Sequence, residues 1–312
     1  AEKFIEDNKP DMLKRLDEEK EAHNKRINDT LGELQQPVLC EIATEDRRNL
    51  DKEIGDAIET LDKIKTSIDQ YQRRNDTLED YTKRMKKDKK EVVNPALKSL
   101  YEKFGERNKL WRNLKGYEEN KRKWMDGEFK ALDTEETERI FKGYETDVSN
   151  AETKLHLLAG ANTPLKGFSD PVLVEFKNRL TFMKGWMPII VSLGNRSLNE
   201  SHWKQVYDKL RDPVKYTTKK NFSLNDLIED DVISIKDFIE EISARASGEA
   251  RIESDLNEIK RIWEETSLVV KPYNDSKDKF ILAETELVSQ QLEDHQAKIQ
   301  SMLAMKYVAS IR

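Results

Sequence analysis

The residues most suggestive of chemistry are His202 and Trp203, side by side in the stretch NESHWKQVYDKL. A catalytic histidine needs a nucleophile or an orienting carboxylate, and the surrounding sequence contains no recognisable triad. From the tryptophan onward, apolar side chains recur at helical spacing, at Trp203, Val206, Tyr207 and Leu210. This spacing predicts Trp203 at the centre of an apolar helix face and His202 at its edge. We interpret the pair as packing.

A second histidine, His295, lies beside Glu293 and Asp294 in LEDHQAKIQSM, and these residue types can bind a metal ion. Adjacent residues point to different faces of a helix, and His23 and His156 fall in separate segments of the sequence. We therefore expect a structural histidine and no metal site.

Glu249 and Glu253 are four residues apart, which would place two catalytic carboxylates on one helix face. However, Arg245 precedes Glu249 by four residues, and Lys260 follows Glu253 by seven. Opposite charges at these positions favour a solvated, charged helix face over acid–base catalysis. We predict no catalytic residue in the chain.

Two further patterns concern phosphate. The run KRMKKDKK, residues 83–90, contains six basic residues that could contact phosphate or an acidic partner. It has no interleaved aromatic residues to stack on bases, and cations are favourable at a helix C-terminus, so we interpret it as a solvated helix end. No glycine is followed by lysine, which excludes the GxxxxGK[ST] nucleotide loop. We expect no cofactor in this segment.

The composition predicts that helices carry these residues. Charged residues make up 37% and hydrophobic residues 36% of the 312 residues, against roughly 25% and 45–50% in an ordinary globular domain. Glycine and proline number 19 (11 plus 8), about half of average usage, which indicates few loops. We predict an all-α, elongated protein with modest cores. The net charge of −6 argues against a basic field for nucleic acid or anionic membranes.

Three other features limit which classes of protein the chain can belong to. The single cysteine, Cys40, excludes an internal disulfide framework and is expected to be a small buried hydrophobe. The longest apolar runs, such as WMPIIV, fall short of the ~20 residues of a membrane helix. The sequence opens without the apolar core of a signal peptide, and we expect it to be an excerpt from a longer chain.

Apolar spacing divides the first half into long helices. Gaps of three and four residues from Ile54 to Met85, with one break at Asn75, predict an amphipathic helix packed in an antiparallel bundle. Further helices are predicted to begin at Pro95 and after Asp133. The glycine- and proline-containing segment AGANTPLKGFSDP, residues 159–171, then predicts a boundary near residue 160.

The second half is also predicted to be helical. Asp170 and Pro171 predict a helix start, with an interruption or bend at Pro188. Two further helix starts are predicted, because Ser223 with Asp226, and Ser234 with Asp237, have the spacing of an N-terminal capping box. No stretch shows a convincing strand alternation.

Three stretches of the second half, in order and spacing, resemble the dynein heavy chain where its tail meets its linker. They are WMPIIVSLGNRSLNESHWKQV, the block from FSLNDL to IKRIWEE, and LVSQQLEDHQAKIQSMLAMKYV. The residues that carry the resemblance are Trp186, Pro188, Asn195, His202, Trp203, Phe222, Glu249, Glu253, Trp263, Leu292, Glu293, Asp294, His295 and Gln296. The chain departs from the family pattern at Asp231, in place of a histidine, and at Ser247-Gly248, in place of a lysine-containing pair.

The resemblance implies a domain organisation and a function. Residues 1–160 would be the last helical bundle of the tail, and residues 161–312 the start of the rod-like helical linker, an N2-type region. The segment would transmit force without catalysis in an ATP-driven microtubule motor, whose AAA+ ring elsewhere in the parent chain binds ATP and Mg²⁺. The third block favours the axonemal class and a cytoplasmic, cytoskeletal location in the axoneme of a cilium or flagellum.

The same resemblance implies the partners. They are the rest of the heavy chain with its AAA+ ring, other dynein heavy chains, and intermediate and light chains. Microtubules would be contacted only through the parent chain, and neither nucleic acid nor membrane is expected. The alternative is a spectrin-like or coiled-coil cytoskeletal scaffold. Such a scaffold would show internal repeats, and the two halves of this sequence show no self-similarity.

Overall fold

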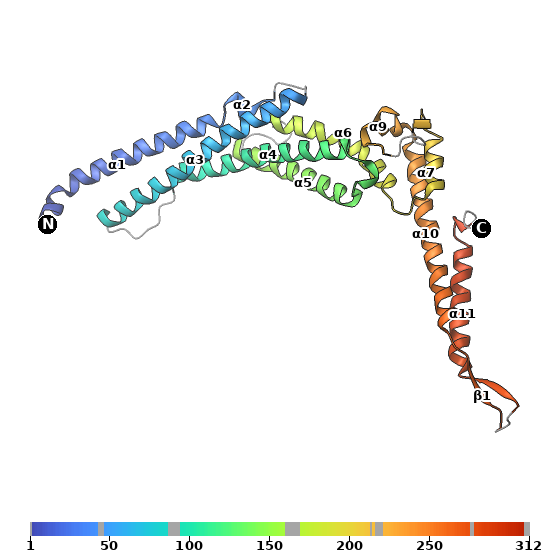
Figure 1. Cartoon of the computed structure of the whole chain (residues 1–312). Coiled ribbons are helices and arrows are strands. Elements are labelled where there is room, and N and C mark those ends of the chain that lie inside the picture. The colour runs from blue at the N-terminus through green and yellow to red at the C-terminus, as the bar shows by residue number, and fades with distance from the viewer. Residues whose placement is uncertain are drawn as a thin grey trace. The chain divides into compact units, whose positions relative to one another are not determined.

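The structure, a computed structural model, describes residues 2–42, 47–86, 94–159, 169–212, 214–215, 221–274 and 278–308. These residues are helical apart from one short β-hairpin and the connections, which confirms the predicted all-α fold class (Figure 1). No helix in this described part is long and apolar enough to cross a bilayer.

The chain divides into two compact units. The first comprises Ala1–Met125 and Glu136–Gly185, and the second comprises Asp126–Glu135 and Trp186–Arg312. The boundary predicted near residue 160 lies outside the described residues, and the helices before and after it belong largely to the same unit.

The first unit is built from long helices. They are α1 (Glu2–Glu33), α2 (Pro37–Cys40), α3 (Arg47–Lys86), α4 (Pro95–Asp126), α5 (Thr134–Ala159) and most of α6 (Pro171–Leu193). α3 includes the whole predicted helix from Ile54 to Met85 and ends within the basic run, of which residues 87–90 lie outside the described residues. Asn75, the break in its apolar pattern, is buried and donates its amide to Glu79 (3.0 Å).

The core of the first unit centres on α4. The apolar residues that α4 buries are Leu97, Leu100, Phe104, Leu110, Trp111, Leu114, Tyr117 and Trp124. The indole of Trp111 donates to the Leu39 carbonyl of α2 (2.9 Å), and the Tyr117 hydroxyl donates to the Arg179 carbonyl of α6 (2.8 Å). Because buried polar atoms need partners, these two bonds fix which helices can pack against α4.

The predicted start of α6 is confirmed. Asp170 accepts a hydrogen bond from the Leu173 backbone N–H (3.1 Å) and a second from the Arg107 guanidinium of α4 (2.7 Å). The same carboxylate therefore caps one helix and holds another. Cys40 is half-buried rather than buried, and its thiol donates to the Leu34 carbonyl (3.3 Å). Burial raises the pKa of this thiol, so it is a neutral packing group.

His23 of α1 makes the first unit sensitive to acid. It is buried against the Tyr71 ring of α3, and burial, followed by the charges of Arg74 and Arg26, holds its pKa below the usual value of 6.5. Protons then bind the unfolded chain more readily than the folded one. The stability is full above about pH 6.5 and falls as the pH drops towards the lowered folded-state pKa.

We expect the His23→Gln variant to remove part of this acid sensitivity. Its urea midpoint should differ less between about pH 7.5 and about pH 5.5, on either side of the unfolded-state pKa of about 6.5, than the wild-type midpoint does. Met12→Leu, a change in the same helix that removes no titratable group, is the control and should keep the wild-type difference. Equal pH dependence in the wild type and His23→Gln would contradict the prediction.

The second unit contains the end of α6 and shorter elements. They are η1 (Phe129–Ala131), α7 (Glu200–Tyr207), α9 (Leu224–Glu229), η3 (Val232–Ile235), α10 (Lys236–Glu265), β1 (Val269–Pro272), β2 (Phe280–Ala283) and α11 (Thr285–Leu303). The strands pair antiparallel, with Val270 opposite Leu282 and Pro272 opposite Phe280. The sequence showed no convincing strand alternation, because four-residue strands are too short to produce one.

Three local predictions concern Pro188, Ser234 and Ser223. An interruption or a bend was predicted at Pro188; the residue lies inside α6, which continues to Leu193, so the helix is not interrupted there. Ser234 does not cap α10; its hydroxyl donates to the Asp231 carbonyl (2.7 Å), within the 3-10 turn before the helix. The capping box of α9 is present as predicted, with reciprocal bonds between Ser223 and Asp226.

Candidate functional site

The candidate site is built around His202, at the start of α7. Asn199 is the N-cap, and its side-chain oxygen accepts from the His202 backbone N–H (3.1 Å). In return, the Asn199 backbone N–H donates to Nδ1 of the imidazole (3.3 Å). These reciprocal bonds form a capping box in which histidine takes the place usually held by glutamate or glutamine. The Asn-x-x-His spacing is the sequence signal that could have revealed this role.

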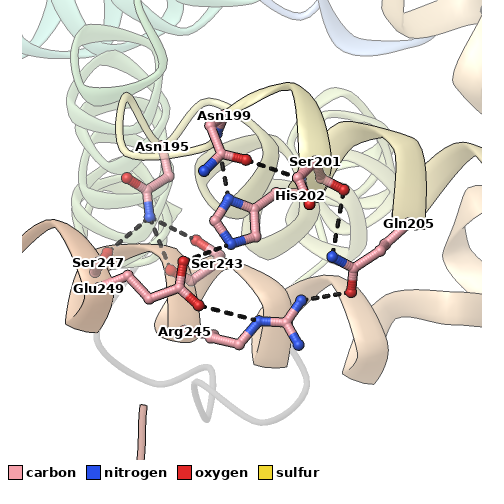
Figure 2. Close-up of polar contacts among 9 residues, drawn as sticks. All are labelled: Asn195, Asn199, Ser201, His202, Gln205, Ser243, Arg245, Ser247 and Glu249. Carbon is pink, nitrogen blue, oxygen red and sulfur yellow. Dashed lines mark hydrogen bonds and ion pairs between the residues drawn. The ribbon is translucent and has the colours of Figure 1, made fainter. Parts of the chain in front are cut away.

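The other imidazole nitrogen reaches α10. Nε2 of His202 lies 3.0 Å from a carboxylate oxygen of Glu249, whose second oxygen lies 3.8 Å from Nε of Arg245. The Arg245 guanidinium donates to the Gln205 side-chain oxygen of α7 (2.6 Å), as Figure 2 shows. We call Asn199, His202, Gln205, Arg245 and Glu249 the polar network. It connects α7 to α10 at two points.

The partners of the imidazole define its tautomer. Nδ1 accepts from a backbone N–H, so the proton of a neutral ring must be on Nε2, where it donates to Glu249. Both imidazole nitrogens therefore have partners without a charge on the ring. A catalytic base would need a free lone pair facing a substrate, and both ring nitrogens are occupied within the protein. The geometry supports a structural role.

The structure inverts the predicted positions of the pair. His202 is 3% exposed, whereas Trp203 is only half-buried. The spacing argument assigned the histidine to the edge because it counted only apolar residues. A buried histidine is tolerated here because the capping box and Glu249 satisfy both nitrogens. Glu249 was also predicted on a solvated face, but its side chain is only 15% exposed.

Trp203 belongs to an aromatic cluster formed by Phe129, Trp203, Tyr207 and Phe222. The Trp203 ring centroid lies 5.7 Å from that of Phe222 and 6.5 Å from that of Phe129, both edge-to-face. Phe129 and Phe222 stack at 5.8 Å, and the Phe129 N–H donates to the Phe222 carbonyl (2.8 Å). Lys130 lies 5.8 Å from the Trp203 centroid. The cluster thus binds the connection between α4 and α5 to α7 and α9.

Tyr207 completes the cluster on the same face of α7. Its ring centroid is 5.5 Å from that of Trp203, and burial raises the pKa of its hydroxyl to about 12. The side chain is therefore neutral over the physiological range and contributes as an aromatic packing group.

Asn195 forms a second link to α10. Its side-chain amide donates to the Ser243 carbonyl (3.0 Å), the Ser243 hydroxyl (2.9 Å) and the Ser247 hydroxyl (2.7 Å) (Figure 2). Its own side-chain oxygen accepts from the Ser197 N–H (3.0 Å), which shapes the loop after α6. Ser243 was not singled out from the sequence, and Ser247 was noted only as a departure from the family pattern, because short hydroxyl side chains carry no periodic signal.

Gly194 ends α6 beside this loop for reasons of space. A Cβ atom at this position would lie 2.2 Å from the Thr134 side chain of α5. Overpacking of this kind costs about 1–3 kcal/mol, so we expect Gly194→Ala to lose about 2 kcal/mol of unfolding free energy, measured by urea denaturation. Gly185→Ala, within α6 and with nothing within 4 Å of the added Cβ atom, is the control and should be neutral or slightly stabilising. Equal loss in both variants would contradict the prediction.

The remaining candidate residues lie apart from the polar network. Trp186 is buried and Pro188 half-buried in α6, while Glu253 is exposed on α10. Trp263 of α10 packs edge-to-face on His295 of α11, with ring centroids 5.9 Å apart. The four residues around this histidine in the motif, Leu292, Glu293, Asp294 and Gln296, are all exposed. Within the described residues, no three His, Cys, Asp or Glu side chains are grouped to hold a metal.

Comparison with known proteins places this arrangement in a family. Residues 97–312 match the family model of the dynein heavy chain, N-terminal region 2. The chain belongs to the dynein heavy-chain family. It corresponds to the N-terminal tail region of dynein heavy chains and not to their catalytic AAA+ ring. The division into a tail bundle and a linker at residues 160 and 161 stays a prediction.

Several similar proteins are axonemal or ciliary dynein chains. Human dynein axonemal heavy chain 6 is 23% identical over 293 residues, which cover 94% of this chain and 6% of that protein. Human dynein axonemal heavy chain 2 is 31% identical over 216 residues, covering 68% of this chain and 4% of that protein. The ciliary dynein beta chain of Tripneustes gratilla is 26% identical over 133 residues, covering 43% and 3%. The chain spans a small fraction of these dyneins, and the scaffold alternative is not supported.

The departures from the dynein pattern have structural counterparts. Asp231 adopts a left-handed backbone conformation (φ 55°) at the turn into η3. Such a conformation is uncommon for residues other than glycine, asparagine and aspartate. A Cβ atom at Gly248 would lie 2.4 Å from the Tyr307 ring, so a larger residue there would displace Tyr307. The position of the Tyr307 ring therefore depends on the glycine at position 248.

Proposed function

We propose that residues 1–312 transmit force between the tail and the motor of an axonemal dynein heavy chain. The observation that carries this proposal is the match of residues 97–312 to a dynein N-terminal region. A segment with this task must resist fraying, since a lever that unfolds locally dissipates the stroke. Such stiffness requires long helices held together by side-chain contacts. The second unit has both, because the polar network and the aromatic cluster connect its helices.

The family-motif residues are proposed to act as packing and positioning groups. His202, Trp203 and Asn195 contact other elements of the second unit through the bonds described above, and Trp263 contacts His295. No catalytic or cofactor role is proposed for them. ATP and Mg²⁺ would bind the AAA+ ring of the parent chain.

The proposed partners follow from membership of a heavy chain. They are the ring and the remainder of the same polypeptide, other heavy chains, and intermediate and light chains, with microtubules reached only through the parent chain. The names of the similar proteins support a cytoskeletal location in the axoneme of a cilium or flagellum. We propose no contact with nucleic acid or membrane.

The first test is ATP-sensitive microtubule pelleting of the endogenous polypeptide. An antibody raised against residues 198–263 would follow the protein. A very large polypeptide that pellets without nucleotide and is released by Mg-ATP would support the proposal. A small polypeptide that ignores both microtubules and nucleotide would overturn it.

The second test separates force transmission from catalysis. In the full heavy chain, His202→Ala should leave microtubule-stimulated ATP hydrolysis close to the wild-type rate but reduce microtubule gliding velocity, because the lever bends under load. Glu253→Ala, at an exposed motif position of α10, is the matched control and should change neither. Loss of ATP hydrolysis in parallel with velocity would contradict a purely mechanical role.

A further inference from the structure

The hairpin formed by α10 and α11 buries little of its apolar surface. The helices run antiparallel, because Trp263 packs on His295 near one end and Ile252 clusters with Met302 near the other. Lys298 of α11 bridges Asp255 and Glu258 of α10, at 3.0 Å each. The buried residues of the described cluster are Ile252, Ile259 and Met302, with Trp263, Met305 and Val308 packed against them.

Beside this small core lies a row of apolar side chains that remain accessible. Leu256 of α10 is 40% exposed and Trp263 is half-buried. On α11, Leu292 is 55% exposed, Ile299 36% and Leu303 48%. We call Leu256, Trp263, Leu292, Ile299 and Leu303 the apolar stripe.

The two halves of the stripe lie on the same side of the helix pair. On α10, Leu256 and Trp263 come four residues after the buried Ile252 and Ile259. On α11, Leu292 and Ile299 come four residues after the half-buried Val288 and His295. Four residues correspond to a rotation of about 40° in the same sense about each helix axis. Because the helices are antiparallel and face each other, the same rotation turns both rows to the same side.

We propose that a helix of the same polypeptide, from outside residues 1–312, packs on the apolar stripe. Residues 292, 299 and 303 have the spacing of seven and four that one helix presents to another, so a third helix could lie across both rows. Its contacting residues would be apolar at helical spacing. The α10–α11 hairpin would then become a three-helix bundle, with Ile252, Ile259 and Met302 at its centre.

The size of the stripe favours a covalently linked occupant. A stable interface between separate chains uses roughly 20–30 residues on each side, far more than the five side chains of the stripe. A segment of the same polypeptide binds at an effective concentration set by its tether, in the millimolar range for short linkers, and needs fewer contacts. The similar dyneins are long enough to provide one, since this chain matches 6% or less of their length.

The inference rests on the proposed function in one respect, because it requires a long heavy chain. It goes further by assigning a surface and the chemistry of its occupant. The test is therefore made on the full polypeptide, whose mass is first measured on a denaturing gel. A polypeptide no longer than this chain would overturn both proposals at once.

The experiment places a photoreactive benzophenone side chain at position 292 or position 299 of the full heavy chain. After illumination and digestion, mass spectrometry identifies the cross-linked peptide. We expect a peptide of the same heavy chain, outside residues 1–312, with apolar residues at helical spacing. Mixing isotope-labelled and unlabelled chains distinguishes this result from a contact with a second copy, which would give mixed pairs.

The matched control places the probe at Gln290, an exposed residue of α11 about 160° around the helix from the stripe at 100° per residue. This probe should give no cross-link to a protein segment. The proposal is overturned, with the proposed function intact, if the stripe probes react with a second copy, with an accessory chain, with residues 1–312, or with no protein at all. Equal cross-linking from position 290 and position 299 would overturn it as well.

Discussion

His202→Ala is expected to lower the unfolding free energy of the second unit by about 3 kcal/mol. Removing one member of a buried polar pair leaves the other without a partner, which costs about 3–5 kcal/mol when the group is charged. Glu249 retains some exposure, at 15%, and Arg245 remains beside it, so we expect the lower end of that range. Urea denaturation of the purified chain, with hydrogen exchange at α7 to locate the effect, measures it.

Glu249→Gln is the informative control for this prediction. The glutamine oxygen can accept the Nε2–H bond of a neutral His202, so this variant should lose less than about 1 kcal/mol. A His202→Ala variant with wild-type exchange at α7 would show that the polar network does not stabilise the helix. A large loss in Glu249→Gln would mean that the pair depends on charge rather than on the hydrogen bond.

Trp203→Ala is expected to cost about 3 kcal/mol and to loosen a segment distant in sequence. Truncation of a large aromatic side chain costs about 3–5 kcal/mol when it is fully buried, and Trp203 is half-buried. Its contacts with Phe129 and Phe222 hold the connection between α4 and α5. Hydrogen exchange should therefore accelerate in residues 126–135 as well as in α7.

Trp203→Phe serves as the control, because it keeps an aromatic ring in the cluster. We expect it to lose about 1 kcal/mol and to leave exchange in residues 126–135 close to the wild-type rate. If Trp203→Ala accelerates exchange only within α7, the aromatic cluster does not anchor the connection, and the role assigned to Trp203 is wrong.

The sequence alone determined the helices and the family. Apolar residues three and four apart fix the face of a helix whatever it packs against, so α3, α4 and the start of α6 were predicted from local patterns. Capping residues act within one turn, which is why the Ser223–Asp226 box could be read directly. Motif order and spacing were sufficient for the dynein resemblance, which the match over residues 97–312 confirms.

Only the tertiary structure decided which side chains meet. The burial of His202 depends on Asn199 within its own turn and on Glu249 from a helix 47 residues later (249 minus 202). Trp203 meets Phe129 from a connection that no local pattern links to it. The apolar stripe likewise became visible only when α10 and α11 were paired. Helical periodicity predicts only which face of one helix is apolar. Burial and the choice of partner depend on contacts between segments that are distant in the sequence.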